Sequence, residues 1–109
     1  MNGTFPEKDW KYLRSVQTDL LTTLFERINS KAMEILQAEL SESDKYRALF
    51  HHIQNADKSV AQCFDDWRRS NIKLKLIALY HHNLLIEEHI EHLTDETKDL
   101  IRKIVIHRR

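Results

Sequence analysis

The residues that decide the fold are 16–36, VQTDLLTTLFERINSKAMEIL. Their apolar side chains recur mostly every three or four positions, which is the spacing of one helical face. At about 100° per residue these side chains cover an arc of about 200°, whereas one partner helix requires only about 100°. This stretch therefore predicts a long helix with more apolar surface than one neighbouring helix can cover.

The rest of the chain also favours helix. The only glycine and the only proline among the 109 residues are Gly3 and Pro6, so later positions lack the residues that usually build hairpin turns. The serines and acids at 41–44 favour the end of one helix and the cap of the next. We therefore predict a single all-α domain over residues 1–109, with a long antiparallel hairpin of helices. The hairpin helices are expected at about 5–40 and 43–69.

The last third of the sequence predicts shorter helices that close over the hairpin. Residues 72–79 are apolar in nearly every direction around a helical wheel, so the helix that contains them must be covered. Asn83 is a residue that can end a helix in the left-handed conformation, and Thr94 begins a new capping pattern. The shorter helices are expected at about 71–82, 86–92 and 94–106.

The wide apolar arc of the first helix predicts a dimeric helical bundle. The second helix has a narrower stripe, so the surplus face of the first helix is expected to meet a second copy of the chain. The residues expected at this interface are Leu21, Phe25, Ala32 and Leu36. In the alternative, the C-terminal helices fold back and cover this face. They would use Leu84, Leu85, Ile90, Leu100, Ile101 and Ile104.

A basic stretch follows the second helix and is a second candidate contact surface. Its residues are Trp67, Arg68, Arg69, Lys73 and Lys75, with no acid between positions 68 and 75. One interpretation is a contact to phosphates or to an acidic partner, with the tryptophan as an aromatic anchor. The other pairs the basic residues with the acid-rich residues 87–99 of the same chain or of its dimer mate. In that interpretation Trp67 belongs to the core.

Histidines and glutamates cluster near the end of the chain, which raises the possibility of a metal site. Glu88, His89 and His92 share one side of a helix, and His81 or His52 would have to complete a ligand set. No established metal-binding motif is present. We therefore predict neither a metal nor a cofactor, and a metal-binding domain remains a lesser alternative.

Arg47 and His52 have the RxxxxH spacing, which resembles the ribonuclease motif of HEPN domains. The resemblance covers six residues, and Ala48 replaces the polar residue usual after the arginine. It implies an all-helical, often dimeric domain in which two such motifs meet across a two-fold axis. A HEPN-like nuclease is therefore a further lesser alternative.

Composition limits the remaining classes of function. Seventeen basic and seventeen acidic residues cancel, so the chain lacks the overall positive field of a general nucleic-acid binder. Cys63 is the only cysteine, and it lies in an apolar helical stripe that predicts burial. No apolar run is long enough for a membrane span.

The sequence therefore predicts a cytoplasmic, non-catalytic interaction module that forms a homodimer and binds an unidentified protein partner. Association with nucleic acid through residues 68–75 is the main alternative.

Overall fold

The computed structural model describes residues 5–108, and this part of the chain contains helices but no strand. The first two helices form a long antiparallel hairpin, as the sequence predicted. A short 3₁₀ turn and three shorter helices follow. The elements are α1 (Glu7–Gln37), α2 (Glu42–Phe64), η1 (Arg69–Asn71), α3 (Ile72–His81), α4 (Glu87–Ile90) and α5 (Asp95–Arg108).

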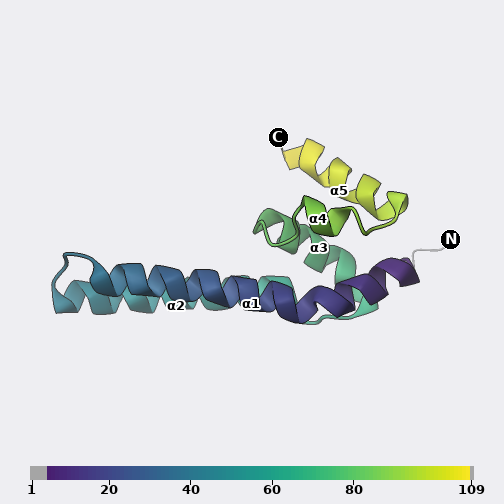
Figure 1. The fold of residues 1–109 in the computed structure, drawn as a ribbon. Helices are drawn as coiled ribbons and strands as arrows, with labels where there is room; N and C mark the ends of the chain where they lie inside the picture. Colours follow the sequence, from purple (N-terminus) through teal and green to yellow (C-terminus); the bar gives the residue numbers. More distant parts are fainter. Residues whose placement is uncertain (1–4, 109) are drawn as a thin grey trace.

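The shorter helices cover only part of the hairpin. Figure 1 shows α3, α4 and α5 stacked over the half that contains the start of α1, while the other half projects beyond them. We call α3–α5 the cap, and we call residues 25–55 the distal hairpin. The molecule measures 57 × 29 × 22 Å, so it is an elongated body with its mass at one end.

The hydrophobic core lies between the cap and the first half of the hairpin. Its buried residues come from the segment before α1, from α1 to α4, from the loops that flank α4, and from α5. They are Phe5, Leu13, Leu20, Leu24, Cys63, Phe64, Ile72, Leu76, Ala78, Leu79, Leu84, Leu85, Ile90, Leu93 and Ile101. The apolar residues of the cap are thus used where the cap meets the hairpin.

A buried carboxylate joins the start of α1 to the start of α5. Asp9 is fully buried, and its Oδ1 accepts a hydrogen bond from the Thr94 backbone N–H at 2.9 Å. Its Oδ2 accepts hydrogen bonds from the hydroxyls of Thr94 and Thr97. An acid at a helix N-terminus satisfies backbone donors that have no partner within the helix. Asp9 therefore caps a helix that lies 85 residues away in the sequence.

The second helix ends earlier than predicted, at Phe64 instead of about residue 69. Asp65 is extended, and Asp66 adopts a left-handed conformation with φ of 58°. Aspartate tolerates this conformation better than most residues, and acids are unfavourable at the negative end of a helix. The apolar stripe continued past this point in the sequence because Trp67 packs back on Phe64, with ring centroids 5.5 Å apart.

The remaining boundaries differ by smaller amounts. The first helix ends at Gln37 because residues 38–41 are needed for the reversal into α2, whose first turn is capped by the Ser41 hydroxyl accepting from the Asp44 N–H at 3.1 Å. The helix expected at 86–92 is a single turn. Asn83 has φ of 59°, so the predicted left-handed terminator after α3 is confirmed.

We predict that Asp9→Ala lowers the free energy of unfolding by roughly 2–4 kcal/mol, because it leaves buried donors of Thr94 and Thr97 without an acceptor. Urea denaturation measures the change. The control is Asp19→Ala at an exposed position of the same helix, which should change stability by less than about 0.5 kcal/mol. Equal effects of the two variants would show that Asp9 does not hold the cap in place.

Candidate functional site

The largest group of exposed apolar side chains lies on the distal hairpin. Seven of the nine exposed large hydrophobic residues belong to it, with exposed fractions from 41% to 71%. We call these seven residues the apolar face. They are Phe25, Met33, Leu36, Leu40, Tyr46, Phe50 and Ile53.

The distal hairpin has no buried core of its own. No side chain between residues 25 and 55 is buried, and the nearest buried residues are Leu24 and Ala56.

Two of the residues predicted at a dimer interface, Phe25 and Leu36, are exposed by 45% and 52%. The other two, Leu21 and Ala32, are half-buried, and Leu21 packs against the core. Of the four predicted residues, only Phe25 and Leu36 therefore lie exposed on the uncovered surface.

The C-terminal helices do not cover this surface. Of the residues that could have done so, Leu84, Leu85, Ile90 and Ile101 are buried in the core beside α3. Leu100 and Ile104 are half-buried on α5. The cap therefore uses its apolar residues to cover α3 and the first half of the hairpin.

The second helix contributes more to the apolar face than its sequence suggested. Tyr46 is exposed by 71%, Phe50 by 51% and Ile53 by 41%. Their spacing of four and three positions places them on one side of α2. A helical wheel could have shown that these three residues share a side, but not that this side lacks a neighbour. Met33 and Leu40 lie near the end of the hairpin, and the sequence alone could not show that they lack a neighbour either.

A polar boundary marks the point where the cap ends. Arg27 of α1 donates from its two terminal nitrogens to the carbonyl oxygens of His82 and Asn83, at 2.8 and 2.9 Å. These carbonyls lie at the C-terminal end of α3, where a cation is favourable. His82 Nε2 lies 3.0 Å from Oε1 of Gln62 on α2. The end of α3 is thus tied to both helices of the hairpin.

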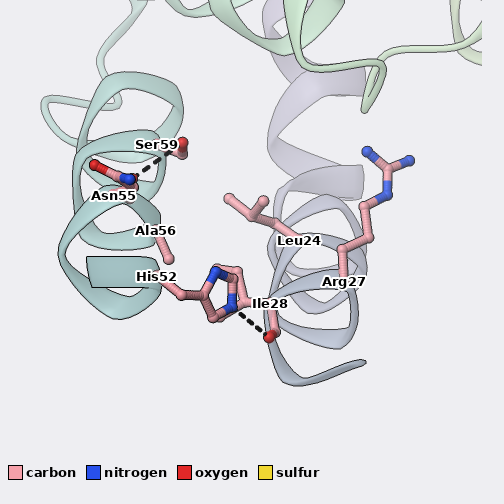
Figure 2. Close-up of a pocket in the computed structure, with 7 residues that line it drawn as sticks. All are labelled: Leu24, Arg27, Ile28, His52, Asn55, Ala56 and Ser59. Atoms are coloured by element: carbon pink, nitrogen blue, oxygen red, sulfur yellow. Dashed lines mark hydrogen bonds between the residues drawn. The ribbon is translucent and has the colours of Figure 1, made fainter. Parts of the chain in front are cut away.

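A shallow pocket of about 240 Å³ lies beside this boundary, between α1 and α2. Figure 2 shows His52 reaching across from α2, where its Nε2 lies 2.9 Å from the carbonyl oxygen of Ile28. Leu24, Ile28 and Ala56 form the apolar wall of the pocket, and Arg27 points away from the helix pair. Of its polar side chains, His52 links the two helices, Ser59 donates to the Asn55 carbonyl oxygen of its own helix, and Arg27 bonds the end of α3.

The basic stretch does not form one surface. Arg69 donates through Nε to the Phe5 carbonyl oxygen at 2.8 Å and lies 3.5 Å from a Glu7 carboxylate oxygen. Lys75 is buried and donates to the Gln62 carbonyl oxygen at 3.0 Å. Arg68 pairs with Asp66 at 3.2 Å, while Lys73 is exposed. In the described residues these partners lie outside the acid-rich segment 87–99, contrary to the pairing expected from the sequence.

Trp67 belongs to the edge of the core. Its ring is half-buried, stacks on Phe64 and packs against the buried cluster. Its indole Nε1 is buried, with no hydrogen-bond partner in the described part of the chain. This position fits an anchor between α2 and α3 better than a contact for an external partner.

The histidines are dispersed among separate contacts. His92 stacks on Tyr12 with ring centroids 4.8 Å apart, and His89 Nδ1 accepts from the Ile86 N–H at 3.1 Å. Within residues 5–104, no three side chains of histidine, cysteine, aspartate or glutamate are placed so that they could hold a metal ion.

The side chains of the RxxxxH pair do not converge. Arg47 is exposed and lies 3.5 Å from an Asp44 carboxylate oxygen, whereas His52 faces Ile28 across the hairpin. A separation of five residues turns the two side chains roughly 140° apart on a helix. One copy of this motif therefore forms no common site for a substrate.

Cys63 is fully buried, as its place in the apolar stripe predicted. Burial raises the pKa of its thiol, and the nearby Lys75 opposes this only in part. A thiol with a raised pKa is a weak nucleophile because the thiolate is the reactive form.

The chain matches no protein-family model, and no curated protein or solved structure is significantly similar to it. No helix in the described residues is long and apolar enough to cross a membrane.

We predict that the boundary between cap and hairpin is sensitive to acid. Burial lowers the pKa of His82, and the positive charges of His81 and Arg27 lower it further. The native chain then binds fewer protons than the unfolded chain near pH 6. The contribution of His82 is therefore fully present above about pH 6.5 and decreases as the pH falls through this value.

Urea denaturation at pH 7.5 and 5.5 tests this prediction. The loss of stability on acidification should be smaller in His82→Gln, which cannot titrate, than in the unchanged protein. His51→Gln, at an exposed position of α2, is the matched control and should leave the loss unchanged. An identical loss in all three proteins would contradict a role for His82.

Proposed function

We propose that this chain is a small non-catalytic protein-interaction module that acts as a helical homodimer. The observation that carries the proposal is the apolar face, which extends over both helices of the distal hairpin. Nothing in the chain's own cap reaches it in the described residues. We also propose that the protein is located in the cytoplasm.

The size of the apolar face supports a stable interface. With about 200 Å² for a large side chain, its exposed fractions amount to roughly 700 Å² per chain. A specific protein interface of standard size buries about 800 Å² per partner. The largest apolar patch on a typical monomer is about 300–600 Å². An apolar face of this size is therefore expected to be covered in solution.

The shape of the apolar face favours a second copy as the partner. Two neighbouring helices that each present one apolar stripe are half of a four-helix bundle. A two-fold axis uses the same surface on both chains, so one chain supplies both halves of the interface. Tyr46 and Phe50 are each more than half exposed, so both offer apolar area to that second copy.

The geometry of the other candidates supports binding over catalysis. The buried Cys63 and the divergent Arg47 and His52 provide no group of reactive side chains. The basic stretch ranks behind the apolar face because Arg69 and Lys75 are engaged within the chain, which leaves Arg68 and Lys73 at the surface. Phosphate binding along a nucleic acid usually requires a continuous row of cations.

We predict that sedimentation equilibrium at tens of micromolar gives a mass near twice 13.1 kDa. Phe25→Glu and Phe50→Glu should each shift the protein to monomer, because a charge would be placed within an apolar interface. The control is Leu74→Glu, which changes an exposed leucine of the cap and should leave the dimer intact.

Two results would contradict the proposal. A mass near 13.1 kDa at these concentrations would exclude the homodimer. Dissociation caused equally by Leu74→Glu would place the interface elsewhere.

A further inference from the structure

Four residues of the apolar face, two on each helix, lie on the side of the hairpin opposite the cap. At about 100° per residue, Phe25 and Leu36 are turned roughly 160–180° from Arg27, which holds the end of α3. On α2, Tyr46 and Ile53 are turned by a similar angle from Gln62, which also contacts the cap. A second copy can therefore approach this face without meeting the cap.

The same side of α1 changes character at its midpoint. Towards the N-terminus, the positions in line with Leu36 are occupied by polar residues. These residues are Lys11, Arg14, Ser15, Thr18 and Thr22, and all of them are exposed. The apolar face is thus confined to the distal hairpin and ends where the polar surface begins.

Acids flank the α1–α2 turn. Glu39 and Glu42 are exposed and flank the reversal between α1 and α2. Two hairpins could meet with their turns together or with their turns at opposite ends. Glu42 pairs with Lys45 of its own chain at 3.3 Å. With the turns together, the two Glu39 carboxylates would come close to each other, and the polar halves of both α1 helices would be buried against the partner. Both effects are unfavourable.

We propose that the second copy binds the apolar face with its hairpin running in the opposite direction. The turn of each hairpin then lies near Phe25 of the partner subunit, and the two caps lie at opposite ends of the dimer. Only the distal hairpins overlap, so Lys11, Arg14 and Thr18 remain in water. This orientation depends on the proposed homodimer, but the dimer does not depend on this orientation.

Spin labels at two exposed positions of α1 test the orientation. With a rise of 1.5 Å per residue, labels at Thr18→Cys should be about 40 Å apart or more across the dimer, because this position lies outside the overlap. Labels at Ser30→Cys, near the middle of the overlap, should be within about 25 Å in either orientation. Pulsed electron–electron double resonance measures both distances. The unchanged protein is the labelling control because Cys63 is fully buried.

The outcomes separate the orientation from the dimer itself. A long Thr18 distance together with a short Ser30 distance supports hairpins that run in opposite directions. Short distances at both positions overturn this orientation while leaving the homodimer in place. A Thr18 label that abolishes the dimer in sedimentation would also overturn it, since Thr18 would then lie in the interface. The absence of any intermolecular distance at Ser30, with a monomeric mass, contradicts both proposals.

Discussion

The cap reaches only half of the hairpin, and most features of this molecule depend on that mismatch in length. A helix of 31 residues such as α1 extends for about 46 Å at 1.5 Å per residue, whereas α3 has ten residues. The rest of the cap, α4 and α5, also has to bury α3, whose side chains are apolar on nearly all sides. Most of the apolar residues of the cap are therefore used close to the core, and none of them covers the distal hairpin.

Polar contacts fix where the cap begins and ends. At one end of the cap, Asp9 holds the first turn of α5 through Thr94 and Thr97. At the other end, Arg27 holds the last carbonyls of α3. Between these points Lys75 binds a carbonyl of α2. Such contacts are specific in direction because a buried donor or acceptor without a partner destabilises the fold. They leave the distal hairpin beyond Arg27 as an extension in which α1 and α2 pack mainly on each other.

The sequence predicted the helices and their order well because that information is local. Helical spacing, the serines and acids at 41–44 and the αL position of Asn83 are all read within a few residues. The end of α2 was missed because Trp67 continues the stripe while sitting outside the helix. The partners of Arg69 and Lys75 lie on other elements, so no local pattern could assign them.

The candidate site was predicted only in part for a related reason. The arc of α1 indicated surplus apolar surface, and Phe25 and Leu36 were found in this way. Tyr46, Phe50 and Ile53 look like an ordinary buried stripe when α2 is considered alone. Their exposure depends on how far the cap extends, which is a property of the whole chain.

The distal hairpin lacks a core, and we propose that it obtains one from a second copy. Two helices without a buried layer are marginal in water, so these residues should open locally in the monomer. Hydrogen exchange at submicromolar and at high micromolar concentration measures this most directly. We predict that backbone amides of residues 26–54 become protected as the concentration rises, while those of α3 are equally protected at both concentrations. Equal protection of residues 26–54 at both concentrations would contradict it.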